Sequence, residues 1–289
     1  MFKVPIKKIY YFIPKNIRSL LLHFSKILVN IEKFENQFIN NTYEKIYFSK
    51  KEKKILVNKI TKMMSSIHSA TNLNLHLYVI DKLFSSAHNF NLNKSFIVEA
   101  GVYKGAMTCS LSLAAKMLGT KLIVYDSFEG LPDIKKKENI VKYHHMKKTS
   151  LYKKGMYKGN YDEVIENIKK FGSYESCIFR KGFFKNSMKN STEKIFFLFL
   201  DVDLLSSTID VIKNLWKNVL DNSYVFTDDA TDLDLNRIWF DKQWWKKNLQ
   251  EKSPGFIGTG CGLPIGGEFS SLGYTIKTPN ISNYKHLNY

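Results

Sequence analysis

The sequence reads Val98-Glu99-Ala100-Gly101-Val102-Tyr103-Lys104-Gly105 where a short apolar run gives way to a segment with helical periodicity. Gly101 permits a tight turn after a strand, and Gly105 permits a close approach of the backbone to a ligand. Glu99 offers a carboxylate to a cation or a hydroxyl at the end of that strand. The stretch is not the G-x-G-x-x-G motif, and its acidic residue disfavours a pyrophosphate ligand. It predicts a strand, a glycine turn and a helix beside a binding site.

Short apolar runs alternate with longer amphipathic segments outward from this turn, between about residues 96 and 235. This alternation is typical of βα units in a parallel sheet, so we expect a Rossmann-like α/β fold. The strands are expected at 96–99, 121–125, 177–180, 195–200 and 224–227. The helices are expected at 106–118, 161–171, 206–220 and 234–249.

The flanking regions suggest a division of the chain at about residue 92. Residues 1–92 carry apolar side chains at helix spacing and are expected to form a helical N-terminal extension to a Rossmann-like domain over 93–289. Within that domain, the Lys-rich segment 133–160 lacks a core pattern, and long loops of this kind are usually lids or binding loops. The end of the chain, 253–289, is rich in Gly, Ser and aromatic residues and is expected to form antiparallel strands and turns.

Acidic residues follow three of the expected strands. Asp126 comes about 20 residues after the first motif, a placement that suits a carboxylate accepting both hydroxyls of a ribose. Asp201 with Asp203, and Asp228 with Asp229, follow two further strands, and the carboxyl ends of parallel strands meet at one edge of a sheet. Converging carboxylates repel one another unless a cation lies between them, and hard oxygen ligands favour Mg²⁺, Ca²⁺ or Mn²⁺. Alternatively, Asp203 or Asp229 caps the helix that follows it.

Taken in order, these motifs resemble the macrocin O-methyltransferase family. The matching stretches are Glu99-Ala-Gly101-Val-Tyr-Lys-Gly105, Asp126-Ser-Phe-Glu-Gly-Leu-Pro132, Leu200-Asp-Val-Asp-Leu-Leu-Ser-Ser-Thr208 and Asp228-Asp229. The resemblance covers about residues 60–245, and the second stretch is the most discriminating. It implies a Rossmann-like fold that binds S-adenosylmethionine and, with Mg²⁺, methylates a sugar hydroxyl.

The resemblance also implies roles for particular residues. Cofactor-binding residues would be Glu99, Gly101 and Gly105 along the methionine and ribose, Asp126 at the ribose, and Ser127, Phe128, Gly182 and Phe183 near the adenine. The metal ligands would be Asp201, Asp228 and Asp229. Family members often have Gly where this chain has Val202 and Tyr where it has Leu205, and the segment 253–289 matches nothing familiar, so the resemblance does not identify the acceptor.

The general base is left open by the sequence. The similar catechol O-methyltransferases have a Lys three residues after the first metal-binding Asp, where this chain has Leu204. The alternatives are Asp203, a metal-bound Asp such as Asp201, or His144 and His145 in the expected lid. Histidines in loops are usually only solvated, but two adjacent histidines in a lid are candidates for proton transfer.

The composition allows two explanations of a strong positive charge. The 289 residues include 44 Lys+Arg against 26 Asp+Glu, a net charge of +18. Because the lysines are scattered, a codon bias explains this better than an anionic partner. The alternative function is therefore a nucleic-acid-modifying or nucleic-acid-binding protein, motivated by the charge and by Trp239, Trp244 and Trp245. Against it, these rings lie close to helix spacing and are expected to pack on the sheet.

Three scattered cysteines and no apolar run of about 20 residues predict a cytoplasmic protein without a membrane span. The basic and apolar segment 1–30 could lie on a membrane surface, although packing on the domain or on a second copy in a homodimer is favoured. The sequence thus predicts a methyltransferase with a small-molecule or glycan acceptor and no nucleic-acid partner.

Overall fold

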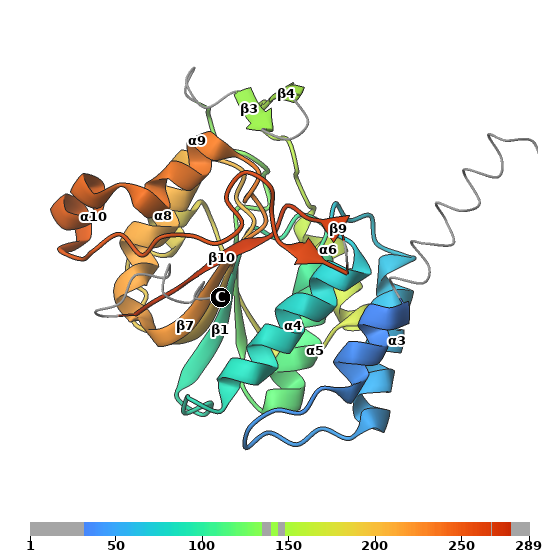
Figure 1. Cartoon of the computed structure of the whole chain (residues 1–289). Helices are drawn as coiled ribbons and strands as arrows, with labels where there is room; N and C mark the ends of the chain where they lie inside the picture. The colour runs from blue at the N-terminus through green and yellow to red at the C-terminus, as the bar shows by residue number, and fades with distance from the viewer. Residues whose placement is uncertain (1–31, 135–139, 144–147, 267, 279–289) are drawn as a thin grey trace, which may run out of the picture.

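The computed structural model describes residues 32–134, 140–143, 148–266 and 268–278. At its centre is a six-stranded sheet in the order β10-β7-β6-β1-β2-β5 (Figure 1). Its strands are β1 (Ser95–Ala100), β2 (Leu122–Asp126), β5 (Cys177–Lys181), β6 (Lys194–Leu200), β7 (Val219–Thr227) and β10 (Gly273–Ile276). All neighbours run parallel except β10, which is antiparallel to β7. The expected Rossmann-like α/β fold is therefore confirmed.

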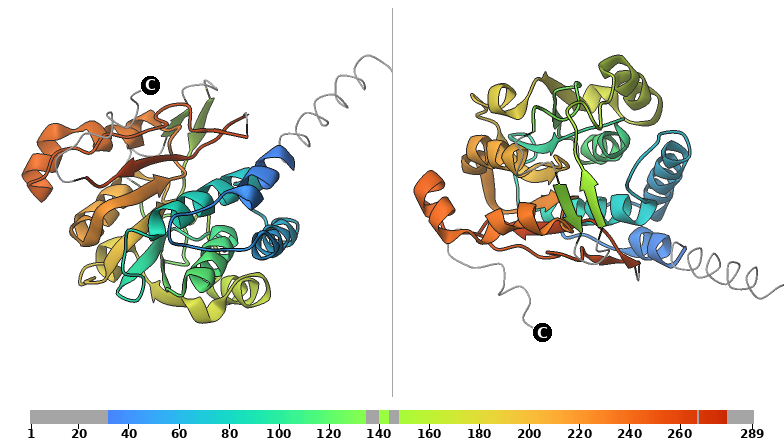
Figure 2. Two further views of the ribbon diagram at one scale, coloured as in Figure 1. Left: turned by 60° about the horizontal axis from the view of Figure 1, so that its bottom comes forward. Right: turned by 90° about the horizontal axis from the view of Figure 1, so that it is seen from above.

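Helices cover both faces of this sheet. They are α3 (Lys50–Met64), α4 (Leu73–Ala87), α5 (Ala106–Leu118), α6 (Tyr161–Phe171), α7 (Phe184–Ser187), α8 (Leu205–Leu215), α9 (Leu233–Asn236) and α10 (Lys242–Leu249). Figure 2 shows α3 and α4 together on one side of the molecule and α10 on the opposite side. None of these described helices is long and apolar enough to cross a membrane.

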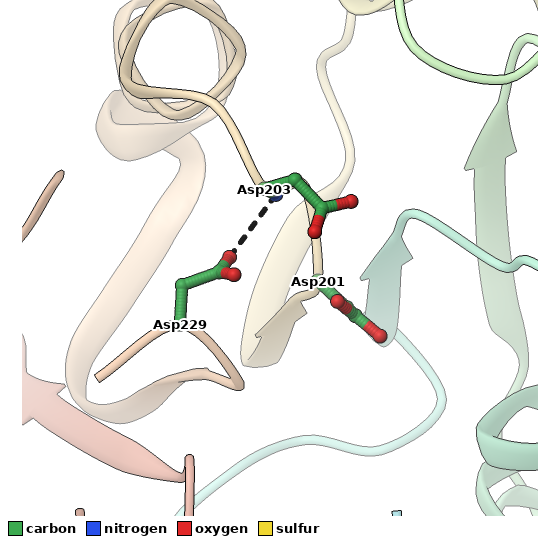
Figure 3. Close-up of side chains that lie close together, drawn as sticks. All are labelled: Asp201, Asp203 and Asp229. Atoms are coloured by element: carbon green, nitrogen blue, oxygen red, sulfur yellow. Dashed lines mark hydrogen bonds between the residues drawn. The ribbon is translucent and has the colours of Figure 1, made fainter. Parts of the chain in front are cut away.

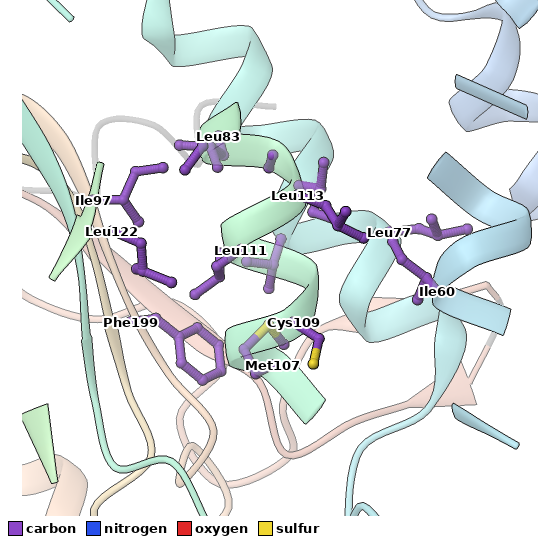
Figure 4. Packing of buried hydrophobic residues seen from close by; sticks show 14 of the residues in the cluster. Ile60, Leu77, Leu83, Ile97, Met107, Cys109, Leu111, Leu113, Leu122 and Phe199 are labelled. Carbon is purple, nitrogen blue, oxygen red and sulfur yellow. The ribbon is translucent and has the colours of Figure 1, made fainter. Parts of the chain in front are cut away.

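Side chains along each strand point alternately to the two faces of the sheet, so the apolar core is divided into one cluster on each face. Ile97 belongs to the cluster under α4 and α5, whereas its neighbour Val98 belongs to the cluster under α8. Successive strand residues point to opposite faces, so a strand buried on both sides is apolar at nearly every position. Figure 4 shows the first cluster, in which Leu111 of α5 lies near Leu122 and Phe199 of the sheet.

The helices before β1 share this core with the sheet. Ile60 of α3, Leu77 of α4 and Phe38 are buried in the same cluster as Ile97. The expected helical region is thus helical where the structure describes it, but its side chains are part of the main core. The division at residue 92 stays a prediction, and the segment 1–30 lies outside the described residues.

Two expected helices end or break earlier than the sequence pattern suggested. The helix expected at 206–220 ends at Leu215, and a 3-10 turn leads into β7, which begins at residue 219. The helix expected at 234–249 is interrupted at Asp241, whose side chain accepts a hydrogen bond from Trp244 N–H over 2.9 Å and caps α10. An N-cap requires non-helical backbone, so Asp241 starts a new helix instead of continuing the old one.

Most tryptophans of this region face the interior. Trp216, Trp239 and Trp245 form a buried cluster with Phe256, and the Trp245 Nε1–H donates to the carbonyl of Ile238 over 2.7 Å. Buried rings cannot stack on exposed bases. The structure therefore removes Trp239 and Trp245 from a nucleic-acid-binding surface, while Trp244 is half-buried against Trp245, with their ring centroids 5.7 Å apart.

The segment expected as a lid contains secondary structure that the sequence pattern did not predict. Strands β3 (Ile140–Tyr143) and β4 (Lys148–Leu151) form an antiparallel hairpin, whose Lys-rich sequence gives no apolar strand signal. Below it, Leu131 and Gly155 are joined by a hydrogen bond of 2.9 Å, and Leu131 N–H donates to Met156 over 2.9 Å. The two stems of the segment are thus tied together. The short strands β8 (Pro264–Ile265) and β9 (Glu268–Phe269), with β10, match the antiparallel structure expected after residue 253.

His76 is a fully buried polar residue of α4 whose ring faces α5. Its Nδ1 lies 2.8 Å from Ser110 Oγ and its Nε2 lies 2.7 Å from Thr71 Oγ1. Burial lowers the pKa of His76 to about 3. The folded chain therefore keeps His76 neutral at pH values where the unfolded chain, with a histidine pKa near 6.5, takes up a proton.

We expect His76 to make the protein less stable as the pH falls from about 6.5 towards 3. At pH 5.5 the lost stability from this group is about 1.4 kcal/mol, because only the unfolded state is protonated. Urea unfolding of the wild type and His76→Gln at pH 7.5 and 5.5 should show a smaller loss in the variant. His68→Gln, at an exposed histidine, is the control and should behave as the wild type does. Equal losses in all three proteins would contradict the assignment to His76.

Candidate active site

A cavity of about 460 Å³ lies at the carboxyl ends of β1, β2, β6 and β7. The strand order reverses between β1 and β6, and open α/β sheets bind ligands outside such a switch point. The size is within the range of pockets for small molecules and cofactors. The residues that line it are His68, Ala70, Gly101–Tyr103, Asp126, Ser127, Gly130–Pro132, Tyr152, Met156, Tyr157, Phe183–Asn186, Asp201–Asp203, Ser207, Asp210, Asp228, Asp229, Thr231, Asp232 and Ser271.

The glycine turn after β1 packs tightly against the end of β6. Gly101 has φ +87°, and a Cβ atom at this position would lie 1.8 Å from the carbonyl oxygen of Asp201. Gly105, also at φ +87°, is the N-cap of α5. A side chain at Gly101 would therefore separate the turn from the strand that carries Asp201. The sequence predicted a tight turn at Gly101, and the close approach found there is between two parts of the chain itself.

Asp126, the last residue of the neighbouring strand β2, accepts a hydrogen bond from the glycine turn after β1. Its Oδ2 accepts a hydrogen bond from Val102 N–H over 2.8 Å, and its Oδ1 accepts one from Phe128 N–H over 2.6 Å. Burial raises the pKa of Asp126, while these backbone donors favour the carboxylate. Each carboxylate oxygen has a second lone pair, so Asp126 can still accept hydroxyl donors from the cavity that it lines.

Glu99 lies behind the turn and does not face the cavity. Its side chain is fully buried, and among the described residues neither carboxylate oxygen has a hydrogen-bond partner. Burial, with added repulsion from Asp201 and Asp126, raises the pKa of Glu99 well above its ordinary value. Such an orphaned group is expected to be protonated or to receive a partner that the chain does not supply.

The side of the cavity near β5 differs in part from the expected adenine site. Gly182 N–H donates to the carbonyl of Asp126 over 2.8 Å, and Phe183, which is 36% exposed, lines the cavity. Ser127 also lines it. Phe128 does not: its ring is buried against Tyr161, with the ring centroids 4.8 Å apart. The side chains of Phe184–Asn186, which the sequence analysis did not single out, lie here as well.

Three aspartates form a tight group at the opposite side. Asp201, Asp203 and Asp229 each offer a carboxylate oxygen, and these oxygens lie within 4.8 Å of one another (Figure 3). The carboxylate of Asp229 accepts hydrogen bonds from Asp203 N–H over 3.1 Å and from Val202 N–H over 3.4 Å. Asp203 itself has φ +58°, in the left-handed region that aspartate tolerates better than most residues, and it lines the cavity.

Asp228 lines the same cavity but is held separately. Its Oδ1 accepts a hydrogen bond from Ser271 Oγ over 2.6 Å. The tight group therefore contains Asp203, expected as a catalytic residue or a helix cap, in the place of Asp228, expected as a metal ligand. Asp203 precedes the N-cap position of α8, which is Leu204, so it is not the cap of that helix.

Burial and mutual repulsion raise the pKa of every carboxyl in this group. The pKa of Asp201 is raised to about 6 and that of Asp229 to about 7, in each case chiefly by burial. The pKa values of Asp203 and Asp228 are raised well above the ordinary range for the same reason. Four half-buried carboxyl groups, whose oxygen atoms can act as ligands, fit a hard divalent cation, which would remove the repulsion.

Two further expectations concern the general base. His144 and His145 lie outside the described residues. Leu204, which replaces the lysine of the catechol enzymes, is buried in a small apolar cluster with Leu131 and Tyr152. The hydroxyl of Tyr152 donates to Oδ1 of Asp203 over 3.3 Å. Tyr152 was not predicted, because no sequence signal links a residue after the lid hairpin to an aspartate about fifty positions further along the chain.

The sheet order, the glycine turn and the acidic residues at the strand ends define a Rossmann-like methyltransferase fold. The macrocin-O-methyltransferase (TylF) family matches residues 86–252, more than half of the chain, and the protein belongs to this family. This confirms the resemblance seen in the motifs. Membership makes the chain part of a family of O-methyltransferases.

Two relatives illustrate the similarity. The chain is 26% identical over 139 residues to the 8-demethyl-8-(2,3-dimethoxy-alpha-L-rhamnosyl)-tetracenomycin-C 4'-O-methyltransferase of Streptomyces olivaceus. That match covers 46% of this chain and 52% of the relative, so the chain spans about half the length of the curated relative that it matches. The structure of the O-methyltransferase NovP is 18% identical and covers 90% of this chain and 99% of its own, with a TM-score of 0.55. The likeness to NovP shows the fold.

Proposed function

We propose that this protein is an S-adenosylmethionine-dependent and divalent-metal-dependent O-methyltransferase that acts on a hydroxyl of a sugar or glycoconjugate. The observation that carries the proposal is one cavity with the glycine turn and Asp126 at one side and half-buried aspartates at the other. Family membership supports the reaction, and the name of the curated relative, a rhamnosyl-tetracenomycin 4'-O-methyltransferase, supports a sugar acceptor.

In this proposal the turn and Asp126 hold the cofactor. Asp126 accepts the ribose hydroxyls, Ser127 and Phe183 border the adenine, and Gly101 and Gly105 keep the backbone close to the methionine part. Glu99, which lies behind the turn and does not line the cavity, would act on the methionine part only through the turn in front of it. When bound, S-adenosylmethionine supplies a methyl group on a sulfonium, which is electrophilic without further activation.

The aspartates are the proposed metal ligands and the proposed base, and both roles act on the acceptor hydroxyl. Asp201, Asp228 and Asp229 are the proposed ligands of a divalent cation, with Asp228 using the oxygen that Ser271 leaves free. Such a cation supplies positive charge that lowers the pKa of an acceptor hydroxyl. Asp203 is the proposed base, because its position is fixed by the hydrogen bond from Tyr152 and its raised pKa makes it a stronger base than an exposed aspartate.

Calorimetric binding of S-adenosylhomocysteine tests the proposal. We expect binding both with Mg²⁺ and with chelator, and an additional heat when Mg²⁺ is added to the metal-free protein. Asp203→Asn should keep the Mg²⁺ heat and lose turnover, whereas Asp228→Asn should lose the Mg²⁺ heat. Absence of S-adenosylhomocysteine binding in both conditions would contradict the proposed function. Loss of the Mg²⁺ heat in Asp203→Asn alone would make Asp203 a ligand in place of Asp228.

We also propose that the protein acts in the cytoplasm as a homodimer, with residues 1–92 as a helical extension and 133–160 as a lid of the methyltransferase domain 93–289. Sedimentation velocity of the full chain tests the dimer. Truncation is a poor test, because Phe38 and Ile60 are buried in the main core. Contact of the segment 1–30 with a membrane surface would appear as co-sedimentation of the protein with anionic vesicles.

A further inference from the structure

Aromatic side chains lie in a row along the cavity and end at the aspartates. The row consists of His68, Tyr103, Tyr157 and Tyr152, whose successive ring centroids are 6.1, 6.2 and 6.3 Å apart. We call these four residues the aromatic row. At its inner end the Tyr152 hydroxyl donates to Asp203, and at its outer end His68 is exposed. All four line the cavity, and no role in the proposed mechanism accounts for the outer three.

Two residues of the aromatic row have a strained backbone conformation, which indicates a functional role for their side chains. Tyr103 has φ +48° and Tyr157 has φ +56°. Bulky residues rarely adopt positive φ, since the Cβ atom is crowded there, and glycine or asparagine would relieve the strain. Strained residues that persist cluster at binding and catalytic sites. Here two strained tyrosines from distant parts of the chain place their rings in edge-to-face contact over the cavity.

The exposure of the rings leaves room for a ligand. Tyr152 is 6% exposed, whereas Tyr157 is 44% exposed, which is high for a large aromatic ring beside a cavity. An aromatic wall with a few polar groups at one end is the usual design of a small-molecule site. A sugar ring fits this design, because it offers a face of C–H groups to the rings and hydroxyls at its edge.

The charges around the aromatic row favour a neutral ligand. Seven aspartates line the cavity, namely Asp126, Asp201, Asp203, Asp210, Asp228, Asp229 and Asp232. Among the described lining residues Lys185 is the single lysine, and it lies beside Phe183 and Phe184 at the proposed cofactor side. Outside the lining, Lys104 has its Nζ 5.9 Å from the centroid of the Tyr103 ring, but this lysine is paired with Glu163 over 3.7 Å. A pyrophosphate on the aromatic row would therefore meet many more carboxylates than cations from these described residues.

We propose that the aromatic row is the acceptor subsite and that it binds the C–H face of a neutral glycoside, with a ring hydroxyl directed towards Asp203. This deepens the proposed function and rests on it. A glycoside that has already left its nucleotide carrier fits this surface, so the reaction that supplies the acceptor is a glycosyl transfer. The row acts by stacking, and its effect is on acceptor binding and not on the cofactor.

Saturation-transfer NMR on the protein loaded with S-adenosylhomocysteine and Mg²⁺ tests this inference. The probes are methyl α-L-fucopyranoside and methyl α-D-glucopyranoside, with thymidine diphosphate glucose as the charged comparison. We expect a neutral glycoside to bind, roughly tenfold weaker binding in Tyr157→Leu, and nearly unchanged binding in Tyr157→Phe, which keeps the ring. Tyr47→Leu is the matched control, since Tyr47 is 90% exposed and does not line the cavity.

The outcomes of this test distinguish a failure of the inference from a failure of the proposed function. Binding of S-adenosylhomocysteine, measured by calorimetry, should be the same in Tyr157→Leu as in the wild type and shows that the variant is folded. If the wild type binds S-adenosylhomocysteine but neither neutral glycoside, or if Tyr157→Leu binds the glycoside as the wild type does, the inference is overturned. Preference for thymidine diphosphate glucose would also overturn it. If the wild type fails to bind S-adenosylhomocysteine, the proposed function itself fails.

Discussion

Asp201→Asn is expected to fold normally and to lose turnover by a factor of about 10² to 10³. Asparagine has the size of aspartate but carries no charge. It therefore neither binds a divalent cation as aspartate would nor repels the neighbouring carboxylates. Removal of a single electrostatic contact of this kind from an active site typically lowers kcat by about 10² to 10³. The measurement is methyl transfer to an acceptor glycoside, together with circular dichroism to verify the fold.

The same variant should be more stable than the wild type when metal is removed. Burial raises the pKa of Asp201 to about 6, so the folded chain is stabilised below pH 4 and loses that stability as the pH rises through 6. At pH 8 in chelator, the uncharged asparagine avoids this loss, worth up to about 3 kcal/mol. Thermal unfolding at pH 8 measures it.

Asp221→Asn is the control for both effects, because Asp221 is an exposed aspartate on β7, the strand that leads to Asp228. It should keep wild-type turnover and wild-type stability. Turnover that survives in Asp201→Asn would show that Asp201 is not part of the catalytic site. If Asp201→Asn melts at a lower temperature than the wild type in chelator, the Asp201 carboxylate is stabilised by contacts within the protein.

Gly101→Ala is expected to have the second large effect, a loss of more than about 3 kcal/mol of stability together with loss of S-adenosylhomocysteine binding. The positive φ of +87° disfavours alanine by about 1 kcal/mol. The larger part comes from overlap, since the new Cβ atom would lie 1.8 Å from the Asp201 carbonyl oxygen. Both the turn and the end of β6 would have to move apart, and both border the cavity.

Gly119→Ala is a matched control for this prediction. Gly119 also has positive φ, +70°, but a Cβ atom there would meet nothing within 4 Å. Gly119→Ala should therefore cost about 1 kcal/mol and leave S-adenosylhomocysteine binding intact. Urea unfolding and calorimetry of both variants make the comparison. Equal destabilisation by the two substitutions would mean that backbone conformation, and not the contact with Asp201, is what requires Gly101.

The central strands of the sheet could be predicted because almost all residues of β1, β2 and β6 are buried. The run at 195–200 became β6 (Lys194–Leu200), with all but its first residue buried, and each expected strand of the parallel sheet was found. Helix ends were less predictable. The helical pattern around 206–220 continued through Trp216, but its ring packs in the tryptophan cluster and the chain turns there into β7. Tertiary contacts decided where that helix ended.

For the candidate site, the sequence could predict which residues follow the strands but not how their side chains are arranged. The sequence placed Gly101, Asp126 and Asp201 after successive strands, and parallel strands necessarily bring such residues to one edge. It could not tell which aspartates come closest, because this depends on side-chain directions after each strand. Asp203 joined the tight group through a positive φ, whereas Asp228 was held by Ser271, which lies 43 residues away.

By itself, the sequence determined the class of fold, the family and the edge of the sheet where the chemistry lies, since local apolar patterns and short motifs encode these features. Only the tertiary structure decided that Phe128 packs inward, that Tyr152 contacts Asp203 and that Tyr103 and Tyr157 face the same cavity. Each of these depends on contacts between residues far apart in the chain. Their partners are chosen by packing of the whole domain, and no local pattern of residues records that choice.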